Sequence, residues 1–167
     1  MKAGDSIIAS ESIQRDLVLH IIQPGLAGLM DGSVSSLAPL FATAYATHNS
    51  HTTFIVGLAT AAGAGISMAF SEALSDDGKL SGRGSPWQRG LASGIMTFAG
   101  AMGHTLPFLF TNFSLAMILT PMIVAFELLA ISLIRYKYMQ TSLGKTLVQV
   151  IVGGVVVFLV GMLIGKD

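Results

Sequence analysis

The sequence predicts an all-α integral membrane protein with five transmembrane helices, an amphipathic N-terminal lead-in and a cytosolic N-terminus. Hydrophobic residues make up 52% of the 167 residues and charged residues only 11%, whereas water-soluble domains carry about 25% charged residues. The apolar residues gather in five stretches, each near the roughly 20 residues needed to cross the hydrocarbon core. The basic residues, in turn, cluster in the segments on one side of these stretches.

The chain divides into an N-terminal segment, residues 1–22, and a five-helix transmembrane domain, residues 23–167. Over residues 13–22, apolar side chains recur at helical spacing beside Arg15 and Asp16, which is typical of an amphipathic helix lying at the membrane interface. Pro24 and Gly25 then predict a bend or break before the first span.

The five spans are predicted at about 25–46, 53–73, 91–110, 113–134 and 146–165. The third and fourth are separated only by residues 111–112, after Pro107, which predicts a tight transmembrane hairpin. The second and third are joined by residues 75–89, whose Gly, Ser and Pro content indicates a loop. Trp87 in this segment fits an anchor at the membrane interface.

The orientation follows from the Lys and Arg residues. Eight of the nine fall before the first span, between the second and third spans, or between the fourth and fifth. They are Lys2, Arg15, Lys79, Arg83, Arg89, Arg135, Lys137 and Lys145, and only Lys166 lies on the other side. The positive-inside rule therefore places the N-terminus in the cytosol and the C-terminus outside.

Closely spaced glycines predict tight contacts between helices. The first, third and fifth spans each carry a pair of glycines with three residues between them. The second span contains Gly63 and Gly65 in an alanine-rich run. In the first span the pair is Gly28 and Gly32. These glycines fit packing within the bundle or at a subunit interface. Five helices are few to enclose a polar path, which favours a homo-oligomer.

Asp31 is the most informative residue, because it places a carboxylate inside the first apolar stretch. A charged side chain at bilayer depth costs roughly 2.5–3.5 kcal/mol, so it is usually kept there for function. The residues that share a helical face with Asp31 have small side chains, so we expect Asp31 to point at a neighbouring helix or a water-filled cavity. The bulky residues Leu26, Leu29, Leu37 and Phe41 should then face lipid. The alternative is an aspartate that only hydrogen-bonds a neighbouring helix.

Met68 and Glu72 share one stripe of the second span with small residues. With a cytosolic N-terminus, Asp31 lies about 9 Å into the membrane, Met68 lies at a similar depth, and Glu72 lies nearer the mouth. These three residues form the predicted metal-transport site. Carboxylate oxygens suit hard and borderline cations and thioether sulfur suits softer metals, so the set favours iron(II) over calcium or magnesium. The alternative for Met68 is a residue that only fills the core.

Four other residues are further candidates. Glu127, in the fourth span, could relay a proton or bond to a neighbouring helix. His104, in the outer half of the third span, could be an outer-side ion exit, a proton acceptor or a structural histidine. These two form the candidate proton relay or second site. Asp76 and Asp77 could collect cations at the cytosolic mouth or belong to a solvated loop.

Three motifs resemble the vacuolar iron transporter family. They are Asp31-Gly32 with Pro39, the run Gly65-Ile66-Ser67-Met68, and the closing run Gly161-Met162-Leu163-Ile164-Gly165. The resemblance runs through all five spans, about residues 16–165. The loop from Asp76 to Pro86 resembles more narrowly the membrane half of bacterial membrane-bound ferritin proteins, which join a ferritin-like domain to a five-helix module and export iron.

The resemblance implies a homodimer in the bacterial inner membrane that exports iron(II) or manganese(II) from the cytosol in exchange for protons, with no permanently bound cofactor. The family's transport aspartate falls on Asp31 and its transport methionine on Met68. A glutamate that some members carry eight residues before this methionine is Thr60 here. The chain also lacks the cytosolic metal-binding helices that plant members insert between spans two and three, and it carries no ferritin-like domain.

Two hypotheses for the function remain. The first is a proton-coupled divalent-metal exporter, and the second is a non-transporting membrane anchor or binding module for a ferritin-like partner. A buried Asp31 favours the first, because an anchor has no need of it. The sequence contains neither HExxH nor GxSxG, so we expect a transporter rather than an enzyme, with no nucleic-acid partner.

Overall fold

The computed structural model describes residues 12–79, 81–139 and 141–166, and within these ranges every regular element is a helix. The first eleven residues of the predicted N-terminal segment, with Lys2, lie outside this description. The elements are η1 (Val18–Ile22), α2 (Gln23–Ser35), α3 (Leu37–Thr47), α4 (Ser50–Ser75), α5 (Pro86–Gly103), η2 (Leu106–Leu109), α6 (Phe113–Met139) and α7 (Leu143–Ile164).

Four helices are long and apolar enough to cross a membrane. They are Ser12–Thr47, Ser50–Ser75, Phe113–Met139 and Leu143–Ile164. Large apolar side chains such as Ile118, Phe126 and Leu163 are more than 60% exposed on their outer surfaces, which suits contact with lipid rather than water. The all-helical class is confirmed, and the four apolar helices indicate a multi-pass integral membrane protein. Helix α5, the predicted third span, has 18 residues and is not among the four.

The first helix continues through Pro24, where the sequence predicts a bend or break. Residues 12–47 form one helix, so Pro24 lies inside it, where its missing N–H removes one backbone hydrogen bond. The preceding turn is the π-helix η1. Its wider hydrogen-bond spacing accommodates the proline ring without ending the helix. The lead-in is therefore a direct extension of α2 rather than a separate helix.

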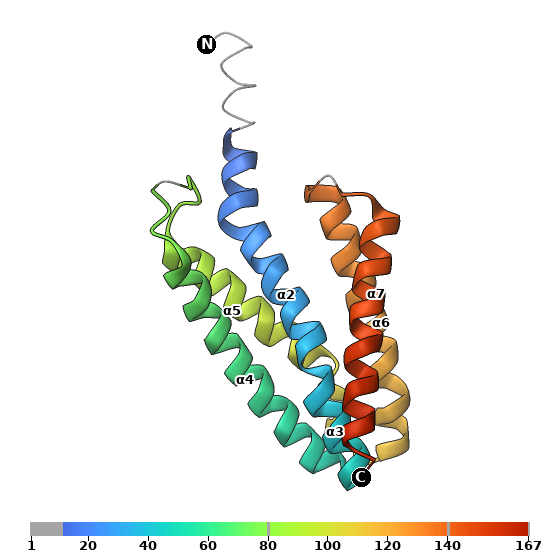
Figure 1. Cartoon of the computed structure of the whole chain (residues 1–167). Coiled ribbons are helices and arrows are strands. Elements are labelled where there is room, and N and C mark those ends of the chain that lie inside the picture. The colour runs from blue at the N-terminus through green and yellow to red at the C-terminus, as the bar shows by residue number, and fades with distance from the viewer. Residues whose placement is uncertain (1–11, 80, 140, 167) are drawn as a thin grey trace.

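The helices form two groups joined by the first helix (Figure 1). Helices α4 and α5 pack beside α2, while α6 and α7 stand as a second pair that α3 contacts through α7. A cluster of Leu26, Leu128, Ile131 and Val150 joins the two groups. The described start of the chain, the loop 76–85 and the α6–α7 connection lie at one end of the molecule, and the C-terminus lies at the other.

The connection between α5 and α6 is longer than the two-residue hairpin that the sequence predicts. Helix α5 ends at Gly103, and the chain passes through the 3₁₀-helix η2 before α6 begins at Phe113. Pro107 lies at the start of η2 and cannot donate the N–H that a continuing α-helix would need. As a result, His104 lies at the end of α5 rather than within a span, and its side chain is fully buried.

Glycines allow α2 and α5 to pack backbone to backbone. A Cβ added to Gly28 would meet the carbonyl of Ser93, and one added to Gly32 would meet the carbonyl of Thr97. Gly65 on α4 packs against Gly94 in a similar way. The glycine pairs therefore serve packing inside the chain. Gly63 differs, because a Cβ there would have no atom within 4 Å.

We expect Gly32→Ala to destabilise the fold, because its methyl group would push α2 away from the α5 backbone. Overpacking of this kind costs about 1–3 kcal/mol. The matched control is Gly153→Ala in α7, where a Cβ has no neighbour within 4 Å. Thermal unfolding of both variants in detergent, followed by circular dichroism, measures the difference. Equal melting temperatures for the two variants would contradict the close α2–α5 contact.

Candidate functional site

Asp31 lies on the exposed side of α2. Ala27, Met30 and Ser35 on this side are exposed, and Asp31 itself is half-buried. Its carboxylate has no hydrogen bond or ion pair with any residue in the described ranges. Its backbone carbonyl accepts a bond from the Ser35 hydroxyl at 2.7 Å. Gly28 and Gly32 hold the adjoining side of α2 against α5, so Asp31 lies at the border between the packed and the exposed sides of the helix.

The expectation that the bulky side of the first helix faces lipid is wrong. Leu26, Leu37 and Phe41 are at most 5% exposed. Helices α6 and α7 cover them, and the rings of Phe41 and Phe158 pack edge to face with centroids 4.6 Å apart. The bulky residues supply the contact between the two helix groups, since large apolar side chains bury the most surface. The small side of the helix, with Asp31, is left exposed.

Met68 lies at the edge of the face by which α4 packs on α5. Ala61 and Gly65 on that face are buried, Met68 is half-buried, and Ser67 beside it is exposed. No hydrogen bond or ion pair in the described ranges joins Asp31 to either Met68 or Glu72. The structure thus places these three residues on two helices without bringing them into one bonded site.

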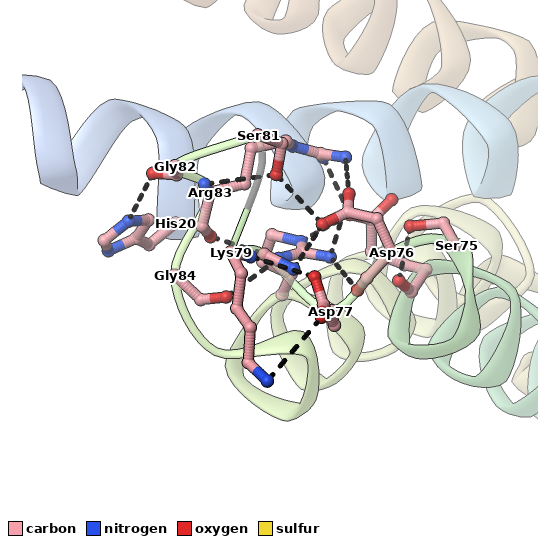
Figure 2. A network of polar contacts seen from close by, with 12 residues as sticks. His20, Ser75, Asp76, Asp77, Lys79, Ser81, Gly82, Arg83 and Gly84 are labelled. Atoms are coloured by element: carbon pink, nitrogen blue, oxygen red, sulfur yellow. Dashed lines mark hydrogen bonds and ion pairs between the residues drawn. The ribbon is translucent and has the colours of Figure 1, made fainter.

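Arg89 organises the loop between α4 and α5 (Figure 2). Its side chain, in the first turn of α5, is completely buried. It donates to the Glu72 carboxylate at 2.9 Å. It also donates to three backbone carbonyls, those of Asp76 (3.0 Å), Arg83 (3.2 Å) and Gly84 (3.0 Å). A guanidinium group has five N–H donors in a rigid plane, so this one side chain fixes both ends of the loop.

Glu72 is held by two arginines rather than left open for a metal ion. Its Oε1 accepts from Arg83 at 2.7 Å and from Arg89 at 2.9 Å. These charge-assisted bonds are strong because both partners are ionised and largely removed from water. A metal ion would have to displace both guanidinium groups to use this oxygen. In this conformation Glu72 is therefore a structural anchor of the loop.

Asp76 belongs to the same network. Its carboxylate accepts from the Ser81 hydroxyl at 2.9 Å and lies 3.3 Å from Arg89 and 3.4 Å from Arg83. The Ser81 hydrogen bond, with help from the Gly78 amide and the two arginines, holds the pKa of Asp76 below its ordinary value of 3.8. Its contribution to stability is thus fully present above pH 3.8 and is lost as the pH falls through the lower folded-state value.

Asp77, the other candidate for cytosolic metal entry, is exposed. It lies 3.9 Å from Lys79, and both side chains are mostly in solvent. The loop also contacts the N-terminal lead-in, where the His20 Nε2 atom lies 3.4 Å from the Gly82 carbonyl (Figure 2). The loop is thus fixed to α4, α5 and the extension of α2.

His104 and Glu127 form a buried pair. His104 Nδ1 lies 3.0 Å from Glu127 Oε2, and His104 Nε2 lies 2.8 Å from the Ser36 hydroxyl. The His104 side chain is completely buried, and that of Glu127 is 12% exposed. Thr120 donates to the His104 carbonyl at 3.3 Å. The sequence groups His104 and Glu127 as a candidate proton relay or second site without predicting a contact between them, and the structure brings them into direct contact.

The hydrogen bonds of this pair require a shared proton. The Ser36 hydroxyl donates its one hydrogen to the Gly32 carbonyl at 2.6 Å, so it must accept from His104 Nε2–H. One further hydrogen then has to lie between His104 Nδ1 and Glu127. The pair is either an imidazolium with a carboxylate or a neutral imidazole with a carboxylic acid. If that proton leaves, Ser36 must turn its hydrogen from Gly32 to His104 for both histidine bonds to survive.

Sequence reasoning missed three of the residues that form these contacts. Arg89 entered only as a positive charge, although a cation in the first turn of a helix opposes the helix dipole, which favours a nearby anion there. Ser36 lies in the first predicted span and His20 in the lead-in, and neither was singled out. Nothing local in the sequence distinguishes Ser36 or His20 from their neighbours.

No cluster of three or more His, Asp or Glu side chains that could hold a metal ion occurs within the described parts of the chain. The chain matches no family model, no curated protein and no solved structure.

Replacing Arg89 should release the loop. In Arg89→Gln, Glu72 keeps one partner and three loop carbonyls lose theirs, which should cost about 3 kcal/mol or more. The control is Lys79→Gln, whose exposed ion pair should contribute almost nothing. Limited proteolysis of the 76–85 loop and thermal unfolding measure the effect. Cleavage rates that match between the two variants would contradict the role given to Arg89.

Proposed function

We propose that this chain is the five-helix membrane domain of a divalent-metal exporter related to the vacuolar iron transporters, acting as a homodimer that exchanges iron(II) or manganese(II) for protons. The observation that carries the proposal is Asp31, an unpaired carboxylate on the exposed side of an apolar helix. A protein that only had to fold would gain by replacing it, because an unpaired charge is costly in lipid.

The course of the chain supports five spans. Helices α2, α5 and α7 lead away from the end that holds the loop 76–85, and α4 and α6 return to it (Figure 1). Helix α5 packs along both α2 and α4, so it occupies the same layer as helices that can cross a membrane. The loop end carries Arg15, Lys79, Arg83 and Lys137. The positive-inside rule then favours a cytosolic N-terminus, and the resemblance to bacterial membrane-bound ferritin proteins favours a bacterial inner membrane.

A homodimer would complete the metal site. Asp31 and the open position at Gly63 lie on surfaces that the described chain does not cover. A two-fold contact between such surfaces would bring the Asp31 carboxylates of two chains together, and Met68 on α4 would add sulfur. Oxygen and thioether ligands together favour iron(II) or manganese(II) over calcium.

The His104–Glu127 pair supports proton coupling. The pair shares one removable proton. Within the described part of the chain, the His104 ring bonds only to Glu127 and Ser36, and the Glu127 carboxylate bonds only to His104. Because both ring nitrogens are engaged, the pair suits a proton better than a metal ion. It lies toward the end opposite the loop, where α5 ends.

A second candidate is a non-transporting membrane anchor for a ferritin-like partner. The loop supports it, since Glu72 and Asp76 are engaged in ion pairs and Asp77 alone among these three candidate acidic residues is left open to collect metal. We favour the exporter because an anchor gives no reason for Asp31.

Asp31→Asn should abolish metal movement while the protein stays folded, because the amide keeps the shape and loses the charge. We expect at least a roughly ten-fold loss of iron(II) flux, the effect of losing one charged ligand. The measurement is metal flux into proteoliposomes under a pH gradient, compared among iron(II), manganese(II), cobalt(II) and zinc(II). Asp16→Asn, in the exposed part of the lead-in, is the matched control. Undiminished flux in Asp31→Asn would leave the anchor as the better hypothesis.

Glu127→Gln tests the proton pair. The amide can still bond to His104 but cannot release a proton, so metal flux should lose its response to an imposed pH gradient and the accompanying proton signal should fall. Thr120→Val removes a neighbouring hydrogen bond without a titratable group, and its coupling should be unchanged. If Glu127→Gln retains full coupling, Glu127 only braces α6.

A further inference from the structure

Two grooves meet at the loop end of the molecule. One, with a volume of about 520 Å³, is lined mainly by polar residues that include Gln14, Arg15, Ser81 and Lys137. The other, with a volume of about 500 Å³, runs between α2, α5 and α6 and is lined by apolar residues that include Leu29 and Ile134. Tyr138 lines both grooves. A polar pocket and an apolar groove are thus joined at one residue.

The polar groove carries unpaired positive charge. Arg83 and Arg89 are neutralised by Glu72 and Asp76, and Lys79 lies beside Asp77. Arg15 and Lys137, by contrast, have no carboxylate partner within the described ranges. The Lys137 ammonium group lies 5.2 Å from the centre of the Tyr138 ring. Asp16, the acidic neighbour of Arg15, lines a different depression with His20.

The adjoining groove is apolar and lies where the two helix groups separate toward the loop end (Figure 1). Ile95 on α5 and Ile134 on α6 both line it. Tyr138 borders both this groove and the polar groove. Aromatic residues favour such a position, between polar and apolar surroundings, at a membrane interface. From the loop end inward, the two grooves therefore present basic side chains, then Tyr138, then apolar side chains.

We propose that these joined grooves bind one phospholipid with an anionic headgroup. Arg15 and Lys137 contact the phosphate and headgroup, and one acyl chain follows the apolar groove between the helix groups. Basic side chains beside a membrane-spanning segment attract anionic lipid, and the apolar groove distinguishes a lipid from a soluble phosphate. The proposal is independent of metal transport.

Native mass spectrometry of the full-length, delipidated protein in detergent tests the proposal. With phosphatidylglycerol and phosphatidylcholine of equal chain length, we expect one phosphatidylglycerol to be retained at lower lipid concentration. The double variant Arg15→Gln/Lys137→Gln should bind it about ten- to thirty-fold more weakly, the loss expected for two charges at a membrane surface. Lys79→Gln/Lys145→Gln removes two charges outside the groove and should bind normally.

The acyl-chain groove is tested separately with Ile95→Trp, which adds bulk at an exposed position and should leave the fold intact. It should weaken binding of long-chain phosphatidylglycerol but not of a short-chain form. Inorganic phosphate is the soluble competitor, and the lipid should resist it. Equal retention of the two lipids, an equal loss in both double variants, or displacement by phosphate at millimolar concentration would each overturn the proposal.

Discussion

A bilayer core offers no water to polar groups, and this constraint shapes the whole chain. Buried hydroxyls of Thr97, Thr105 and Ser132 bond to carbonyls one turn back in their own helices, Arg89 is enclosed by carbonyls and a carboxylate, and His104 bonds through both ring nitrogens. Each follows the rule that backbone and side-chain polar groups in lipid are satisfied internally. Asp31 does not follow it. Among the described residues, the buried hydroxyls of Ser33, Ser50 and Ser93 also lack a hydrogen-bond partner, but Asp31 differs from them because it carries a charge.

The direction of Asp31 is set by residues that carry no charge. Gly28 and Gly32 let α2 approach the α5 backbone, and Leu26 and Phe41 hold the first helix against α6 and α7. With two sides of the helix committed to packing, the side with Asp31 is the one that remains. Close packing of small residues is a principal source of helix association in lipid, so the position of the functional group depends on the glycines.

The sequence was sufficient for the properties that depend on composition and period. The helical class and four of the five apolar stretches follow from hydropathy, and the structure confirms them. The sequence left Gly28 and Gly32 open between packing in the bundle and a subunit interface, and in the structure they pack against α5. It was insufficient where one residue could bond to many others. The Glu72 carboxylate could bind a metal ion or pair with an arginine equally well. Only the fold shows that Arg83 and Arg89 reach it. The effect of Pro24 was also misjudged, because a π-helical turn can absorb a proline and has no sequence signature that we could apply.

The polar links between the two helix groups are concentrated near one end. Glu127 and Thr120 of α6 bond to His104, and near the loop end the described residues show a weak contact of Arg135 with the Met30 sulfur at 4.0 Å. Apolar contacts can slide, whereas hydrogen bonds fix direction and distance. If one group rocked against the other, the hydrogen bonds of His104 would keep the displacement smallest near that end. Eleven residues separate Glu127 from Tyr138, about 16 Å of helix, so a tilt of roughly ten degrees about His104 would displace Tyr138 by about 3 Å.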